Sequence, residues 1–256
     1  MKNLSKLLLT LALAIGLTPV LANEAGYPLE RAPDQSNNLA ALQHGAKLFV
    51  NYCLNCHGAT AMRFNRLRDI GLTEDQIRQN LIFGSNKVGD TMKVSMTTAD
   101  AKQFFGVAPP DLSVIARSRS SAQGTGADWL YTYLRTFYRD EAAVTGWNNM
   151  VFPGVAMPHV LWQLQGVNAP KYVEKADPHH PGKMAREFEG FAQLSPGSLG
   201  KTEYDHAVAD LVSFLSYVSE PSQTSRKQLG VWVLLFLALF FVITWRLNHS
   251  FWKDVK

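Results

Sequence analysis

The sequence predicts a mainly α-helical body that is exported and then held by one C-terminal transmembrane helix. Three observations support this prediction. Residues 1–22 begin with basic residues and continue with apolar ones, residues 202–219 have apolar residues at every third or fourth position, and residues 229–245 are uncharged. Alternating patterns typical of strands are weak, and no internal repeat is visible. The expected architecture is therefore a helical domain with long loop insertions.

Helix signals occur in four stretches, at residues 38–52, 73–81, 128–138 and 202–219. Asp128 is the expected N-cap of the third helix, Thr202 with Asp205 is expected to cap the fourth, and Pro221 should end it. Residues 84–110, rich in Gly, Ser and Thr, are predicted to be loop with short helices. Residues 153–200, rich in Pro, Gly and His, are predicted to be irregular.

Residues 1–22 have the layout of a secretory signal peptide. Lys2 and Lys6 give a basic start, an apolar stretch follows, and small or apolar residues end at Ala22, where we place the cleavage. An uncleaved signal anchor is the alternative, but the apolar run is short for a membrane span and Pro19 helps to end it. This interpretation implies export of the body, residues 23–225.

The apolar run near the C-terminus predicts a membrane anchor over residues 226–248. Its 17 uncharged residues, 229–245, would form about 25 Å of helix, the lower limit for a span, and they are apolar on every face. Trp232 and Trp245 near its ends are typical of interfacial aromatics. Basic residues flank both ends, so the signal peptide decides the topology. We expect the body on the periplasmic side of a bacterial inner membrane, with a cytoplasmic tail at 249–256.

The positive net charge of the chain belongs to its membrane segments. Of 25 basic and 21 acidic residues, the signal segment holds two bases, and residues 226–256 hold five bases and one acid. Residues 23–225 therefore carry 18 bases and 20 acids, a net charge of −2. Because the body has no basic cluster suited to phosphates, we expect no nucleic-acid partner.

Both cysteines lie in one motif, Cys53-Leu54-Asn55-Cys56-His57. Two thiols at this spacing can form thioethers to the two vinyl groups of one porphyrin, with the adjacent histidine under the iron, so the motif predicts one covalently attached haem c. A thioredoxin-like pair would need a strand–helix redox unit, and a zinc site would need further Cys or His ligands at regular spacing. Two cysteines also exclude a disulfide-dense scaffold and a four-cysteine iron–sulfur or zinc centre.

The ligand opposite His57 decides what such a haem does. An open site permits catalysis or gas binding, whereas a methionine or second histidine closes it for electron transfer, and a methionine raises the potential. Met157 is the leading candidate because the Pro and Gly residues of 152–158 stiffen and expose its loop, and Met150 is the next choice. Most other methionines and histidines are expected to be ordinary, and seven of them are assigned core, surface or loop positions: Met62, Met92, Met96, His44, His179, His180 and His206.

The run 106–113 contains the pair Pro109-Pro110 and precedes Arg117 and Arg119. Two prolines form a rigid extended wall that suits packing on a porphyrin face. An arginine can pair bidentately with haem propionates. A proline turn followed by solvated arginines explains the same residues, and the local sequence by itself favours this simpler interpretation.

Taken in order, these features closely resemble the cytochrome c1 family, the haem c subunit of the cytochrome bc1 complex. The order is a signal peptide, Cys53-x-x-Cys56-His57, the 108–113 run with its two arginines, the 153–158 methionine loop and one C-terminal span. The resemblance covers nearly the whole chain after the signal peptide. All c-type cytochromes share the haem motif, but the combination of features is far more specific.

The resemblance implies a function and partners. The function is one-electron relay: the Rieske iron–sulfur protein reduces the haem, and the haem reduces a cytochrome c acceptor, while quinol is oxidised in cytochrome b. The C-terminal helix would pack beside cytochrome b in the bilayer of a dimeric complex. No catalytic acid or nucleophile is expected. The resemblance implies that Cys53 and Cys56 form the thioethers and that His57 and Met157 are the axial ligands. It also implies that Pro110 packs near the haem and that Arg119, in preference to Arg117, binds a propionate.

The chain also departs from the family pattern. The stretch between His57 and Gly106 lacks the long acidic segment of mitochondrial relatives, and residues 163–183 look like an insertion to which we assign no role. Two other functions stay open. One is a membrane-anchored monohaem cytochrome that serves a different oxidase or dehydrogenase. The other is a haem sensor or peroxidase with an exchangeable sixth ligand.

Overall fold

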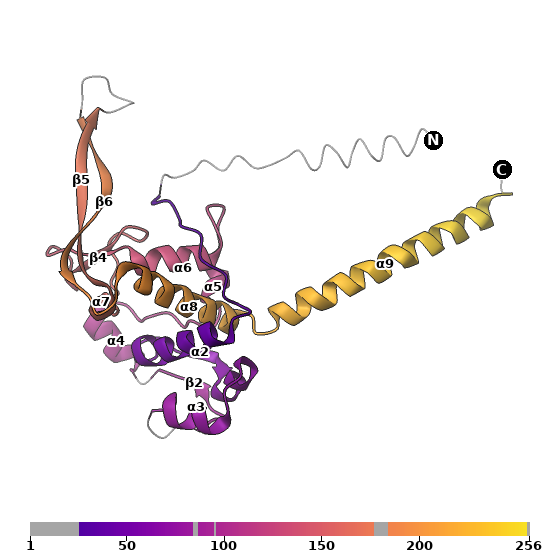
Figure 1. Ribbon diagram of the computed structural model, residues 1–256, viewed down its shortest axis with the longest axis horizontal. Helices are drawn as coiled ribbons and strands as arrows, with labels where there is room; N and C mark the ends of the chain where they lie inside the picture. Colours follow the sequence, from indigo (N-terminus) through magenta and orange to yellow (C-terminus); the bar gives the residue numbers. More distant parts are fainter. Residues whose placement is uncertain (1–25, 84–86, 95, 177–183, 255–256) are drawn as a thin grey trace.

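The computed structural model describes residues 26–83, 87–94, 96–176 and 184–254, so the predicted signal peptide and its cleavage point lie outside the described residues. Helices dominate, as predicted, and the strands within these ranges pair into three small antiparallel sheets (Figure 1). The elements in chain order are α2 (Leu39–Leu48), the π-helical turn η1 (Phe49–Cys53), β1 (Ala59–Arg63), the 3-10 helix η2 (Phe64–Ile70), α3 (Glu74–Asn80), β2 (Thr91–Met92), α4 (Thr98–Phe105), α5 (Ile115–Ser118), α6 (Gly126–Arg135), β3 (Phe137–Arg139), β4 (Trp147–Asn149), α7 (Trp162–Gln165), β5 (Gly166–Ala176), β6 (Met184–Pro196), α8 (Lys201–Ser219) and α9 (Gln223–Trp252).

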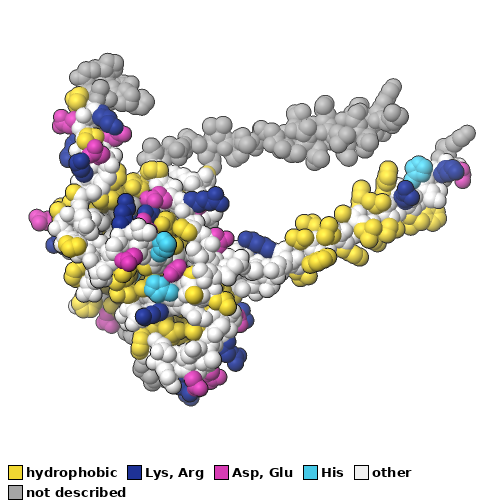
Figure 2. All heavy atoms as spheres, viewed as in Figure 1, with side chains coloured by type: hydrophobic (Ala, Val, Ile, Leu, Met, Phe, Trp, Pro, Cys, Tyr) yellow, Lys and Arg dark blue, Asp and Glu magenta, His cyan; other side chains and the backbone are white. Residues whose placement is uncertain are grey.

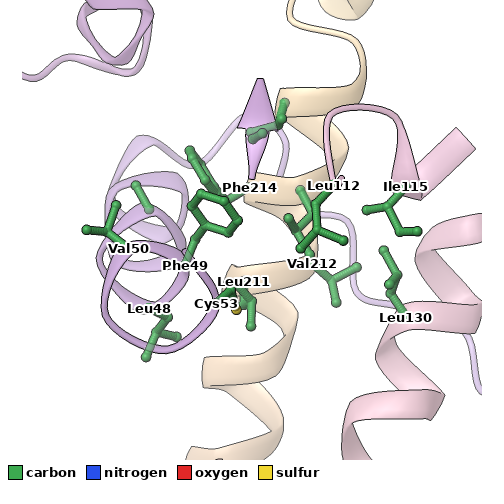
Figure 3. Packing of buried hydrophobic residues seen from close by; sticks show 14 of the residues in the cluster. Leu48, Phe49, Val50, Cys53, Leu112, Ile115, Leu130, Leu211, Val212 and Phe214 are labelled. Atoms are coloured by element: carbon green, nitrogen blue, oxygen red, sulfur yellow. The ribbon is translucent and has the colours of Figure 1, made fainter. Parts of the chain in front are cut away.

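Helix α8 forms the centre of the body, with α2 on one side and α5 and α6 on the other (Figure 3). Gly45 of α2 allows the two helices to approach closely, because a Cβ there would lie 2.2 Å from the Asp210 carbonyl oxygen. One turn further on, the rings of Phe49 and Phe214 meet with centroids 5.7 Å apart. Both rings are fully buried, so this crossing anchors the hydrophobic core directly before the cysteine motif.

The start of α6 differs from the prediction. Its N-cap is Thr125, whose hydroxyl accepts from the Asp128 backbone N–H at 3.1 Å. Asp128 is the third helical residue, and its carboxylate accepts from the backbone N–H of Thr125 at 2.9 Å and of Ala32 at 2.8 Å. Asp128 thus completes a capping box rather than capping the helix itself. The helix also ends at Arg135, and the three residues after Thr136 form strand β3.

The prediction of irregular structure over 153–200 is wrong for β5 and β6. These strands pair antiparallel from Gly166–Pro196 to Ala176–Met184, with two irregularities in register, and they form a ribbon that projects from the body (Figure 1). The 163–183 segment, without an assigned role, contributes its first strand. The strands were hard to predict because Pro170 and Gly190 interrupt the alternation of apolar and polar residues along them.

The start of α8 also differs from the prediction. Gly200 is the N-cap, and its N–H donates to the Glu203 carboxylate at 2.9 Å. Thr202 and Asp205 do not cap the helix; the Asp205 carboxylate instead accepts two hydrogen bonds from Arg135, at 2.6 and 3.0 Å. The helix ends at Ser219, before the predicted break at 221.

Helix α9 leaves the body and makes no buried contact with it (Figure 1). Its 30 residues correspond to about 45 Å of helix, which exceeds the hydrocarbon thickness of a bilayer. Apolar side chains cover it along its length, with Lys and Arg near both ends (Figure 2). Within the described part of the chain it is the one helix long and apolar enough to cross a membrane.

Candidate functional site

All six residues predicted for the site line one cavity of about 380 Å³. The cavity lies against α8, whose Leu211 and Leu215 form part of its wall. Its lining is mostly apolar and aromatic. The predicted residues come from three segments that are far apart in sequence and converge only in the fold: Cys53, Cys56, His57, Pro110, Arg119 and Met157.

Cys53 is the last residue of the π-helical turn that extends α2, and Cys56 follows it by three residues. Beyond it, the Cys53 carbonyl oxygen accepts from the backbone N–H of Cys56 at 3.1 Å and of His57 at 2.8 Å, which closes a tight turn. Neither thiol is in a disulfide. Burial raises the pKa of Cys53 to about 12, with a contribution from Cys56, and burial also raises the pKa of Cys56. Both therefore stay as neutral thiols on the cavity wall at neutral pH.

This arrangement does not suit a zinc site. Zinc needs about four protein ligands, and the two thiols supply only two of them. In residues 26–83, 87–94, 96–176 and 184–254, no group of three or more His, Cys, Asp or Glu side chains is placed to hold a metal ion.

The imidazole of His57 is fixed by the double-proline run. Its Nδ1 donates to the Pro110 carbonyl oxygen at 2.8 Å, which leaves the lone pair on Nε2. Burial lowers the pKa of His57, although the bond to Pro110 and the charge of Asp111 act in the opposite direction. A neutral imidazole with a free Nε2 is the form that binds a metal. Pro110 therefore does more than line the cavity, which was its expected role.

Further hydrogen bonds tie the double-proline run to the segment after the histidine. The Leu112 backbone N–H donates to the Gly58 carbonyl oxygen at 2.7 Å, and the Asp111 carboxylate accepts from the Thr60 backbone N–H at 2.9 Å. The Ser113 hydroxyl accepts from the Ala61 backbone N–H at 2.9 Å. Residues 58–61 and 110–113 are thus held together, which keeps the Pro110 carbonyl oxygen in place.

The methionine loop is held by two asparagines. The Asn148 side-chain oxygen accepts from the Gly154 backbone N–H at 2.8 Å. The Asn149 side-chain oxygen accepts from the backbone N–H groups of Val151 and Phe152, at 2.9 and 3.1 Å. Met157 reaches the cavity from this loop, whereas Met150 does not line it. Met62 and Met92 are buried in the core, as predicted.

The two candidate arginines are separated by the fold. The guanidinium of Arg119 lies at the cavity, 4.6 Å from the centroid of the Trp129 ring and 6.0 Å from that of Phe152. Arg117 is exposed and lines a different hollow. The aromatic rings orient the Arg119 side chain by cation–π contact. Only Arg119 of the two is placed to meet an acidic group of a molecule in this cavity.

The described histidines outside the motif do not line the cavity. His44 Nδ1 lies 2.8 Å from the Asp210 carboxylate at the surface, one of the ordinary positions predicted for it. His159 stacks on the Phe137 ring, with centroids 4.9 Å apart, and burial lowers its pKa to about 4. His179 and His180 lie outside the described residues.

Sequence reasoning missed several aromatic residues of the site. Trp129 and Tyr133 of α6 and Phe152 of the methionine loop line the cavity, as do Tyr52 and Phe105. Tyr133 also places its hydroxyl 3.4 Å from the Met157 Sδ. The signal was present, because Trp129 and Tyr133 stand four residues apart and so share one face of a helix.

Sequence comparisons relate the chain to known proteins. A sequence model described as the cytochrome C1 family matches residues 31–255. The chain is 47% identical over 247 residues to the ammonia monooxygenase gamma subunit of Nitrosomonas europaea, which covers 96% of this chain and 97% of that protein. It is 42% identical over 251 residues to cytochrome c1 of Allochromatium vinosum, with 98% and 99% covered. Cytochrome c1 of Rhodospirillum rubrum is 26% identical over 275 residues. The chain therefore belongs to the cytochrome c1 family, the membrane-bound electron-transfer subunits of the bc1 complex that carry a covalently bound haem c.

Proposed function

We propose that haem c is attached through Cys53 and Cys56, with His57 Nε2 and Met157 Sδ as the axial ligands of its iron. One observation carries this proposal: two free thiols, an imidazole already fixed through its Nδ1, and a thioether line the same apolar cavity. The thioether comes from a segment 100 residues after the histidine. When bound, the haem supplies a reversible one-electron couple.

The other residues that line the cavity suit the porphyrin ring and the propionates of haem c. Pro110 and the aromatic residues form an apolar wall for the porphyrin, and Arg119 provides a cation for a propionate. Arg119 has no acidic partner within 4.0 Å among the described residues, so its charge is available to that propionate. The Pro110 carbonyl oxygen orients the His57 imidazole and makes it more basic, which would strengthen a bond to iron, while burial favours the neutral form of the ring.

We further propose the electron path and topology of the family for this chain. The Rieske iron–sulfur protein would be the donor and a cytochrome c the acceptor, and α9 would pack beside cytochrome b within a dimeric complex. Residues 1–22 would be a signal peptide, residues 23–225 a periplasmic domain, 226–248 the anchor and 249–256 a cytoplasmic tail. A body of net charge −2 would attract a basic cytochrome c weakly, with an association rate that falls as salt rises.

A second candidate rests on the Nitrosomonas relative, whose printed name makes it a subunit of ammonia monooxygenase. The same haem site could serve another membrane oxidoreductase, because the chemistry would be the same and only the partners would differ. The Allochromatium relative, almost as similar over the full length, favours the bc1 assignment.

Affinity purification of the full-length chain from its native membranes separates the two candidates. The bc1 assignment predicts copurification of cytochrome b and the Rieske protein, with b- and c-type signals in a reduced-minus-oxidised spectrum. Copurification with monooxygenase subunits and without cytochrome b would support the second candidate. A chain truncated after Arg226 should be lost from the complex; its full retention would show that α9 is not the main anchor.

A further inference from the structure

The side chain of Tyr133 contacts the sulfur of Met157, and haem attachment does not require this contact. It lies on α6, is 7% exposed, and its hydroxyl is 3.4 Å from the Met157 Sδ, within hydrogen-bonding range for sulfur. A thioether sulfur has two lone pairs and is a weak acceptor. It can therefore accept from a phenol with one lone pair and keep the other for a metal.

The ring of Tyr133 is held in one orientation from two sides. The Trp129 ring stacks on it, with centroids 4.7 Å apart and planes 14° from parallel. The Phe137 ring meets its edge at 5.0 Å and 71°. Movement of the ring away from the sulfur would have to displace the half-buried Trp129 and the fully buried Phe137, so the contact is preorganised.

The side chain of Asn149 also links α6 to the loop that carries Met157, through hydrogen bonds to backbone groups of both. The Asn149 side chain donates to the Tyr133 carbonyl oxygen at 2.7 Å, and the same amide accepts from the backbone N–H groups of Val151 and Phe152. Asn149 is completely buried. Tyr133 and the loop that carries Met157 are thus fixed to each other by both a side-chain bond and a backbone bridge.

We propose that Tyr133 is a positioning residue whose hydroxyl orients the Met157 thioether and raises the reduction potential of the centre. The inference rests on the proposed function, in which Met157 is the sixth ligand. A hydrogen bond donated to the sulfur withdraws electron density from it. The sulfur then donates less to the iron, which favours the reduced, less positively charged state.

The test compares three variants of the full-length chain in the purified complex: Tyr133→Phe, Met157→Leu and the control Tyr131→Phe. Tyr131 is equally buried on the same helix, but its ring lies beneath the Arg135 guanidinium and outside the cavity lining. The readouts are the sulfur–iron absorption band of the oxidised protein, the midpoint potential from redox titration, and carbon monoxide binding by the reduced protein.

Tyr133→Phe should keep the sulfur–iron band, lower the midpoint potential and increase carbon monoxide binding. At a fixed ambient potential the ratio of oxidised to reduced haem should rise about two- to tenfold, the range of one buried hydrogen bond. Tyr131→Phe should change none of these readouts. An unchanged potential in Tyr133→Phe, or an equal shift in Tyr131→Phe, would overturn the inference.

Met157→Leu separates failure of this inference from failure of the proposed function. If it removes the sulfur–iron band while Tyr133→Phe leaves the potential unchanged, only the role of Tyr133 is rejected. If it leaves the band intact, Met157 is not the ligand and both are rejected. If Tyr133→Phe does not assemble, 3-fluorotyrosine at this position, a stronger donor of nearly the same shape, should raise the potential; a fall or no change would contradict the inference.

Discussion

Two clusters of aromatic side chains in this protein differ in what surrounds them. In the cavity, Trp129 and Tyr133 stack beside two free thiols, a fixed imidazole and an arginine without an acidic partner among the described residues. On the β5–β6 ribbon, the Phe188 ring packs edge to face on the rings of Tyr172 and Phe191. There, Lys and Glu side chains pair across the strands (Figure 2). Aromatic clustering alone does not indicate a site; reactive and charged groups with unused bonding capacity do.

The largest expected effect on stability comes from disrupting the packing of α2 against α8 behind the cavity. In Gly45→Ala the new Cβ would meet the Asp210 carbonyl oxygen at 2.2 Å and the Phe214 Cβ at 2.7 Å, so α2 and α8 would have to separate. Overpacking of this kind should lower the free energy of unfolding by about 3 kcal/mol, because backbone must move. Thermal unfolding of the detergent-solubilised chain measures the loss.

Gly89→Ala is the matched control, because no atom lies within 4 Å of its added Cβ. It should leave the melting temperature unchanged. A Gly45→Ala protein as stable as the parent would show that the α2–α8 crossing is looser than described and that the cavity does not depend on it.

The next effect concerns Met157, the proposed sixth ligand. Met157→Leu keeps an apolar side chain of similar volume and should cost less than about 1.5 kcal/mol in stability. It removes the sulfur, so the reduction potential should fall by on the order of 0.1 V, well inside the range of about 0.8 V that axial ligands span. If the Rieske centre is the donor, as proposed, its reduction of the haem should slow accordingly.

Met150→Leu provides the control for this variant, because Met150 precedes the same loop but does not line the cavity. Its midpoint potential should equal that of the parent protein. A parent-like potential in Met157→Leu would remove Met157 from the site.

A smaller effect is expected at the capping box of α6. Asp128→Asn removes a carboxylate that accepts from the backbone N–H groups of Ala32 and Thr125, and it should cost about 1 kcal/mol. Burial alone would raise the pKa of Asp128, but these hydrogen bonds outweigh it and lower the pKa below 3.8. The stabilisation is therefore complete above the unfolded pKa and is lost as the pH falls through the lower folded pKa.

Unfolding curves at neutral pH and near pH 3 test this assignment. The difference between the parent protein and Asp128→Asn should be largest at neutral pH and should narrow in acid. A difference that stays the same or grows in acid would contradict the described hydrogen bonding.

The smallest effect is expected on the ribbon. Lys171 pairs with Glu189 at 2.5 Å and Lys175 with Glu187 at 2.8 Å, but all four side chains are about half exposed. Lys171→Gln and Lys175→Gln should each change stability by less than about 0.5 kcal/mol, because exposed ion pairs contribute little. Neither should alter the reduction potential. A potential shift in either variant would mean that the ribbon communicates with the cavity.

Residues with local chemical signatures could be predicted from the sequence. The cysteine motif, the methionine between Pro and Gly, and the Pro-Pro run with Arg119 all line the cavity. The contacts that hold them come from distant segments and left no local signal. The Pro110 carbonyl oxygen on His57 spans 53 residues, and the Tyr133 hydroxyl on Met157 spans 24.

Errors in the predicted elements have local physical causes. Thr and Asp both favour helix starts, so the sequence did not distinguish them. The N-cap of α6 is Thr125, and Asp128 is the third helical residue, which completes the capping box. The ribbon was missed because Pro170, Gly190 and two register irregularities obscure its alternation, and because its strands depend on each other rather than on a buried face.

Covalent attachment of one haem to Cys53 and Cys56 is the central claim, and a mass spectrum of the full-length protein after denaturation tests it most directly. The mature polypeptide should be heavier than its sequence by one haem, the addition should map to the peptide that contains residues 53–57, and a Cys53→Ala, Cys56→Ala variant should lack it. A polypeptide of unmodified mass, with both thiols open to alkylation, would contradict the claim.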